Sequence, residues 1–159
     1  MVEFKTADLS DQYGEEIQIC EFSFLRFGGM SRFMGPINTV RVFEDNIKVR
    51  EALEDIEPGS VLVVDGGGSL KCALLGDQLA ALAVSRGIAG VIINGAVRDV
   101  AELRGTDLGV LAIGSNPKKS KKNGVGERGV PLFFGGVHWR TRDYVYVDDD
   151  GVVISKVKR

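Results

Sequence analysis

The sequence of 159 residues contains a single histidine, His138, and only two cysteines, Cys20 and Cys72. This scarcity excludes zinc sites built from several histidines or cysteines. A serine hydrolase triad would need His138 as its base, and no G-x-S-x-G motif supplies the serine. We therefore interpret His138 as structural and expect any bound metal to be a hard cation with oxygen ligands. We expect the cysteines to be buried free thiols in a reducing cytosol, and a disulfide is the alternative.

An excess of positive charge is also missing, because 20 basic residues face 22 acidic ones and the formal net charge is −2. A nucleic-acid-binding protein normally carries net positive charge, so we expect no direct contact with nucleic acid. No apolar run approaches the ~20 residues of a membrane span, and the N-terminal segment is acidic and polar rather than signal-like. We therefore expect a cytoplasmic protein that does not contact a membrane.

Proline is rare, with 4 residues, whereas glycine is frequent, with 21. No repeat and no low-complexity linker divides the chain, so we expect one domain over residues 1–159. Strand and helix patterns alternate in the middle of the chain, and strand patterns follow at its end, which predicts an α/β domain with a mixed sheet. The predicted helices are Thr6–Tyr13 with Thr6 as N-cap, Asn46–Asp55, Gln78–Arg86 and Asp99–Arg104. The predicted strands are Val40–Asn46, Ser60–Val64, Gly90–Ile93, Gly109–Ile113, Pro131–Phe134, Asp143–Val147 and Val152–Ser155.

Three further segments give no strong indication of function. The KKSKK run at residues 118–122 indicates a solvated loop; an RNA contact is the alternative, but no aromatic stacking platform lies nearby. The acidic segment Asp148–Gly151 indicates a turn. Gly66–Ser69 follows a strand but lacks both G-x-G-x-x-G and a G-K-[ST] ending, so it indicates a nucleotide site only weakly.

One group of residues points to chemistry at an edge of the sheet. In a right-handed βαβ unit, the crossover helix begins at the edge where the following strand ends. The helix that starts after Gly76 and the strand that ends before Arg98 should therefore meet there, even if Leu70–Leu75 forms an additional strand. We expect free backbone amides, one guanidinium and the carboxylates of Asp77, Asp99 and Glu102 along this edge.

Such a group suits an anionic substrate chelated to a divalent cation. The helix start and Arg98 would bind a carboxylate, and Asp99 would ligate Mg²⁺ directly while Asp77 and Glu102 act through water. A purely structural interpretation stands beside it. Asp77 can cap its helix, Asp99 and Glu102 fit a capping box, and Arg98 can be an exposed side chain. Spacing alone favours the caps.

The same residues match a family pattern, D-x20-R-D-x2-E/D, with Asp77, Arg98, Asp99 and Glu102 at its charged positions. The sequence resembles the class II 4-hydroxy-4-methyl-2-oxoglutarate aldolases, whose fold is shared with the regulator of ribonuclease activity A. The resemblance extends along most of the chain through Phe27-Gly28-Gly29, Gly35-Pro36, Val42-Phe43-Glu44-Asp45-Asn46, Val61–Ser69, Asn94–Asp99, Asn116–Ser120 and Gly135-Gly136-Val137.

The resemblance implies a swivelling β/β/α domain, assembled as a cyclic trimer with sites at the subunit boundaries. It makes Gly76-Asp77-Gln78-Leu79 the substrate-binding segment, Arg98 a substrate contact and Asp99 the direct ligand of Mg²⁺ or Mn²⁺. The implied reactions are cleavage of 4-hydroxy-4-methyl-2-oxoglutarate into two pyruvates and decarboxylation of oxaloacetate, both through the enolate of pyruvate. Asp77 and Glu102 are the remaining candidates for catalysis.

Two other functions are attached to the same family. The first is regulation, in which the protein docks on ribonuclease E without performing chemistry. The regulatory branch tends to carry an uncharged amide at the position of Asp99, so the carboxylate here favours the enzyme. The second is methyl transfer, for which the sequence offers no G-x-G nucleotide loop. The longer aldolases add an acidic residue from a C-terminal extension, which has no counterpart after Arg159.

Overall fold

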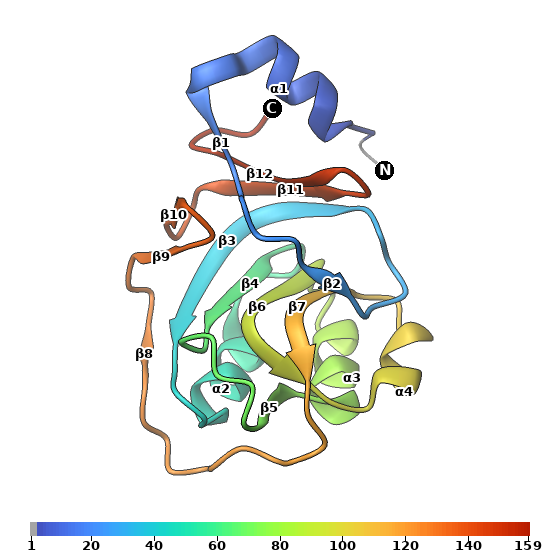
Figure 1. The fold of residues 1–159 in the computed structure, drawn as a ribbon, viewed down its shortest axis with the longest axis vertical. Helices are drawn as coiled ribbons and strands as arrows, with labels where there is room; N and C mark the ends of the chain where they lie inside the picture. Colours follow the sequence, from blue (N-terminus) through green and yellow to red (C-terminus); the bar gives the residue numbers. More distant parts are fainter. Residues whose placement is uncertain (1–2) are drawn as a thin grey trace.

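A computed structural model describes residues 3–159 as a single α/β domain built around one large mixed sheet (Figure 1). The strand order is β1-β12-β11-β3-β4-β6-β7-β2; β5 pairs with β6, β8 pairs with β3, and β9 and β10 form a separate pair. The helical elements are α1 (Thr6–Tyr13), a 3-10 turn (Gly14–Glu16), α2 (Ile47–Asp55), α3 (Asp77–Ser85) and α4 (Val100–Arg104). The strands are β1 (Ile17–Ile19), β2 (Leu25–Arg26), β3 (Phe33–Arg41), β4 (Val61–Asp65), β5 (Ala73–Leu75), β6 (Gly90–Val97), β7 (Gly109–Ser115), β8 (Glu127–Arg128), β9 (Leu132–Phe134), β10 (Val137–Trp139), β11 (Tyr144–Asp148) and β12 (Gly151–Ser155).

Strands β3, β4, β6 and β7 run parallel, and their alternating side chains separate two cores. In β4, Leu62 and Val64 face the core beneath α2 and α3, whereas Val61 and Val63 face a second core that contains Trp139. These four of the five β4 side chains are fully buried, as expected for a strand covered on both faces. The sheet is therefore a rigid platform whose carboxyl-terminal edge carries the loops (Figure 1).

The predicted elements in the middle of the chain are confirmed to within a few residues, but the strand predicted from Val40 to Asn46 is wrong. Strand β3 ends at Arg41, because Glu44 takes a left-handed backbone conformation with φ of 57° and turns the chain toward α2. Its earlier half was missed because Gly35 and Pro36 interrupt the apolar pattern. Pro36 is tolerated there because β4 begins to pair only at Ile37.

The predicted N-cap at Thr6 is also wrong, since Lys5 occupies that position and Thr6 is the first helical residue. Instead, the backbone amide and the hydroxyl of Thr6 both donate to the buried carboxylate of Asp148, at 2.7 and 2.6 Å. Asp148 is the last residue of β11, and the turn expected at Asp148–Gly151 covers only Asp149 and Asp150, so one residue of that acidic segment fastens α1 to the sheet. Although burial raises it, the pKa of Asp148 lies below its ordinary value because these hydrogen bonds stabilise the carboxylate.

The two scarce residue types behave as expected in the structure. Cys20 and Cys72 are free and buried, which confirms the prediction of two thiols, and burial raises the pKa of each. His138 lies in β10, where its backbone amide donates to the side chain of Gln18 and its ring packs against Phe133. None of the helices within residues 3–159 is long and apolar enough to cross a membrane.

Candidate active site

A cleft of about 210 Å³ opens where α3 begins and β6 ends. Strand β5 pairs in parallel with the end of β6, with Leu75 opposite Val97, so Gly76 and Arg98 follow their strands side by side. The amide of Arg98 donates to the carbonyl of Leu75 at 3.0 Å and locks the two ends together. The expected meeting of helix start and strand end is confirmed, and β5 is the additional strand.

Six of the seven candidate site residues line this cleft: Gly76, Asp77, Gln78, Leu79, Arg98 and Asp99. Glu102 does not line it; this residue lies in the exposed first turn of α4, although its charge is close enough to contribute to the raised pKa of Asp77. The geometry therefore supports a core of Asp77, Arg98 and Asp99 and leaves Glu102 at the margin.

Neither of the predicted caps forms. The N-cap of α3 is Gly76, and Asp77 is its first helical residue. Asp99 is the N-cap of α4 by position, but no side-chain cap bond forms, because its backbone is left-handed with φ of 58° and ψ of 45°. This conformation turns the carboxylate toward α3, where Oδ2 accepts the backbone amide of Asp77 at 2.9 Å. The capping box of Asp99 and Glu102 is therefore wrong.

The left-handed backbone at Asp99 is uncommon for a residue with a side chain and costs of order 1 kcal/mol or more. Aspartate tolerates it better than most residues because its short side chain is polar. The carboxylate that results stands beside a second one. A hydrogen bond with Asp99, burial and the charge of Asp99 together raise the pKa of Asp77 above its ordinary value. Two adjacent carboxyl groups at the mouth of a cleft form an arrangement that a cation would stabilise.

Much of the remaining lining comes from two segments that were not predicted to belong to the site. The start of α2 contributes Asn46, Ile47 and Arg50, and the KKSKK run contributes Lys119, Ser120 and Lys122. The lysines are exposed, as expected of a solvated loop, but Ser120 is buried and the run forms one wall of the cleft. Four cationic side chains, Arg50, Arg98, Lys119 and Lys122, thus face two carboxylates in the lining.

This charge distribution defines a site for small anions rather than an apolar pocket. Arg98 is half-buried and can present its planar guanidinium to a carboxylate or an oxyanion. The described residues of the lining include neither histidine nor cysteine, and no group of three His, Cys, Asp or Glu side chains within residues 3–159 is placed to hold a metal ion. A bound cation would therefore rely on one or two carboxylates and on oxygens from water or substrate, as Mg²⁺ commonly does.

Fold and cleft together define a small α/β protein with a charged cleft at the carboxyl ends of its parallel strands. The chain belongs to the RraA-like family (Aldolase/RraA), whose model matches residues 6–154. A Bacillus cereus relative, provisionally named a 4-hydroxy-4-methyl-2-oxoglutarate aldolase, is 53% identical over 153 residues and 96% of each chain.

Two solved structures share the fold almost completely. A protein described as an S-adenosylmethionine:2-dimethylmenaquinone methyltransferase from Geobacillus kaustophilus superposes with a TM-score of 0.96 at 57% identity, covering 98% of this chain and 96% of that one. The RNA-processing inhibitor RraA from Thermus thermophilus gives a TM-score of 0.96 at 47% identity, covering 99% and 96%. The predicted fold and family are confirmed, and the names of these relatives span three different functions.

Proposed function

We propose that this protein is a divalent-metal-dependent lyase that cleaves 4-hydroxy-4-methyl-2-oxoglutarate into two pyruvates and decarboxylates oxaloacetate. The observation that carries the proposal is the cleft itself, in which Asp77, Arg98, Asp99 and the first amides of α3 converge. Both substrates carry two carboxylates, and the excess of cationic side chains in the lining complements that charge. The aldolase names of relatives with more than half of their residues identical support the same assignment.

The donor set of the cleft fits Mg²⁺ or Mn²⁺. Asp99 would ligate the cation directly, and Asp77 would hold its water shell. The positive charge would favour the ionised form of Asp77, whose pKa is raised by a hydrogen bond with Asp99 and, to a smaller extent, by burial and the charge of Asp99. When bound, such a cation supplies positive charge beside the C1 carboxylate and C2 carbonyl of a 2-oxo acid. The residues themselves bind and orient the substrate around that charge.

Arg98 has the central part in the proposed chemistry. In the aldol cleavage the C3–C4 bond breaks, its electron pair moves toward the C2 oxygen, and the C4 hydroxyl loses its proton. In the decarboxylation the same C3–C4 bond breaks and CO₂ leaves. The guanidinium of Arg98 would stabilise the negative charge that grows on the C2 oxygen in both reactions, an effect worth several kcal/mol. The product enolate then takes a proton at C3 and leaves as pyruvate.

The second carboxylate of 4-hydroxy-4-methyl-2-oxoglutarate is retained in the product, whereas that of oxaloacetate leaves as CO₂. Besides Arg98, the cationic side chains in the lining that are available for a second carboxylate are Arg50, Lys119 and Lys122. The side chain of Lys122 already donates to Asn46 at 3.0 Å, so its ammonium group is oriented at the cleft before any ligand arrives. A substrate with a single carboxylate would leave these groups unpaired and should bind more weakly.

The decisive assay measures pyruvate release from both substrates, with and without Mg²⁺ or Mn²⁺. We expect turnover that starts on addition of either metal and stops with EDTA. Absence of turnover on both substrates under all metal conditions would refute the proposal. Sedimentation of the same preparation tests the proposed cyclic trimer, which a lone monomer at micromolar concentration contradicts.

A second candidate function is regulation of RNA processing through binding to ribonuclease E. It is favoured by the 47% identity and near-complete overlap with the Thermus RNA-processing inhibitor. Binding of this protein to ribonuclease E, together with inactivity on both oxo acids, would select it. The methyltransferase description of the Geobacillus relative receives less support from this chain. The glycines after β4 lead through a turn into β5 rather than into a helix that could bind a nucleotide phosphate.

A further inference from the structure

The two lysines lie in a long segment, residues 116–128, which is irregular up to the short strand β8 at its end and which we call the strap. It leaves the end of β7, passes the carboxyl ends of the parallel strands and continues to β8 (Figure 1). Backbone bonds fasten it beside the cleft: Ala73 donates to the carbonyl of Lys118 at 2.8 Å, and Lys121 donates to the carbonyl of Glu44 at 2.8 Å. The strap residues that line the cleft, Lys119, Ser120 and Lys122, lie between or next to these bonds.

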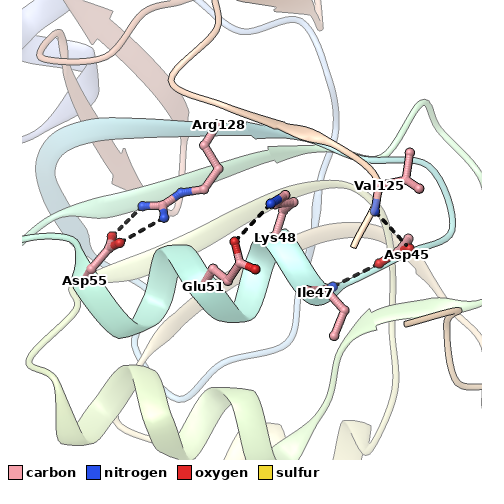
Figure 2. A network of polar contacts seen from close by, with 7 residues as sticks. All are labelled: Asp45, Ile47, Lys48, Glu51, Asp55, Val125 and Arg128. Atoms are coloured by element: carbon pink, nitrogen blue, oxygen red, sulfur yellow. Dashed lines mark hydrogen bonds and ion pairs between the residues drawn. The ribbon is translucent and has the colours of Figure 1, made fainter. Parts of the chain in front are cut away.

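Beyond the lysines, the strap is held by one buried carboxylate. Asp45 is only 2% exposed, and its Oδ2 accepts the backbone amides of Asn123 and Val125 at 2.8 and 3.3 Å. Its Oδ1 accepts the amide of Ile47 at 3.1 Å, the first residue of α2 (Figure 2). Asp45 therefore joins the strap to the start of α2, which also contributes to the lining of the cleft.

A second contact between the strap and α2 is an ion pair at the other end of the helix. Figure 2 shows the guanidinium of Arg128 paired with the carboxylate of Asp55 in the last turn of the helix. The strap thus follows α2 from Asp45 to Asp55. Neither Asp55 nor Arg128 lines the cleft. Asp45, in contrast, directly precedes Asn46 in the chain and accepts the amide of Asn123, the residue after Lys122.

We propose that Asp45 is a positioning residue that sets the binding of the second carboxylate of a 2-oxo dicarboxylate. It does so by fixing the strap lysines, Lys119 and Lys122, relative to Asn46 and Arg50 at the start of α2. Asp45 does not line the cleft and touches no reacting atom. The inference rests on the proposed function for the identity of the ligand and extends it to the residue that shapes the far subsite.

Asp45→Ala tests the proposal with two readouts on the intact protein. The first is the dissociation constant of 2-oxoglutarate with Mg²⁺, because this dicarboxylate lacks the C4 hydroxyl needed for aldol cleavage and reports binding alone. The second is the KM and kcat for 4-hydroxy-4-methyl-2-oxoglutarate, which keeps its second carboxylate through the reaction, whereas oxaloacetate loses that group as CO₂. We expect the dissociation constant and KM to rise about tenfold or more, equivalent to about 1.4 kcal/mol, with kcat within about threefold of the wild type. Hydrogen exchange at Asn123 and Val125 should accelerate in parallel.

Two control variants separate positioning from general loss of stability. Asp148→Ala removes another buried carboxylate that accepts backbone amides, but it lies against α1 and far from the strap. Asp55→Ala releases the strap at the end remote from the cleft. Both should lower the melting temperature while leaving 2-oxoglutarate affinity within about twofold. Asp45→Asn keeps one acceptor oxygen for the strap and should recover most of the affinity lost in Asp45→Ala.

The outcomes are distinguishable. Unchanged 2-oxoglutarate affinity in Asp45→Ala, or an equal loss in Asp148→Ala, overturns the positioning role. If the wild type binds 2-oxoglutarate in an Asp45-dependent manner but turns over neither substrate, the proposed lyase fails and the positioning role stands. If the wild type neither binds nor reacts, both are overturned. Faster hydrogen exchange at Asn123 and Val125 in Asp45→Ala, together with a raised KM and a preserved kcat, supports both the positioning role and the proposed lyase.

Discussion

Replacing Gly76 with alanine should disable the site while leaving the fold intact. A Cβ at this position would lie 2.6 Å from Oδ2 of Asp99 and 3.2 Å from Cγ of Arg98. The first distance is about 0.8 Å short of the 3.4 Å at which ordinary contact begins, so Asp99 must move. Because a misplacement of about 1 Å can reduce turnover about a hundredfold, we expect kcat/KM to fall about that much, equivalent to ~2.7 kcal/mol in the barrier.

The stability cost of Gly76→Ala should be small. The backbone at Gly76 has φ of −134° and ψ of −164°, an extended conformation open to alanine. Alanine is a poorer N-cap than glycine, which costs about 1 kcal/mol in the free energy of unfolding. Pyruvate release from oxaloacetate with saturating Mg²⁺ measures the first effect, and urea unfolding measures the second.

Gly105→Ala is the matched control, because a Cβ there meets nothing closer than the carbonyl oxygen of Glu102 at 3.7 Å. It also lies near α4, with φ of −92°, and should retain nearly full activity. The steric reasoning is refuted if Gly76→Ala turns over oxaloacetate as fast as Gly105→Ala, since the crowding at Asp99 would then have no catalytic consequence.

Four further outcomes are expected. Asp99→Asn should change stability by less than ~1 kcal/mol, because asparagine tolerates the left-handed backbone and can accept the same amide, yet turnover should fall about a hundredfold or more; near-full activity would contradict a metal role. Lys119→Met and Lys122→Met should each raise the KM for 4-hydroxy-4-methyl-2-oxoglutarate about tenfold with little change in kcat, and an unchanged KM in both would rule them out as carboxylate contacts. EDTA should abolish turnover without moving the melting temperature, whereas a large thermal shift would indicate a structural metal. Stability should decline as the pH falls below ~4, because hydrogen bonds lower the pKa values of Asp45 and Asp148 in the native state, so the unfolded chain binds more protons; thermal scans should show a weaker pH dependence in Asp148→Asn.

The sequence by itself was sufficient to predict the central βαβ architecture and to place three charged residues, Asp77, Arg98 and Asp99, at one edge of it. Hydrophobic periodicity placed α2, β4, α3 and β6 within a few residues, because these elements bury regular apolar faces. The rule that a crossover helix begins where the next strand ends then brought Asp77 close to Arg98 and Asp99. Prediction from local patterns failed where the residues are atypical of the element they form. The first half of β3 was missed because Gly35 and Pro36 are unusual within a strand.

Tertiary structure alone decided how the site is completed. Whether Asp99 caps its own helix or reaches across to α3 depends on a left-handed backbone that no sequence spacing specifies. The KKSKK run lies along the cleft because contacts with distant segments hold it there: backbone bonds to Ala73 and Glu44, and the strap amides that Asp45 accepts 78 and 80 positions further along the chain. Such long-range bonds leave no periodic signal in a single sequence, since each partner lies in an irregular segment. The charged edge of the sheet was therefore predictable from local rules, whereas the contribution of the basic segment to the cleft is decided only by the tertiary structure.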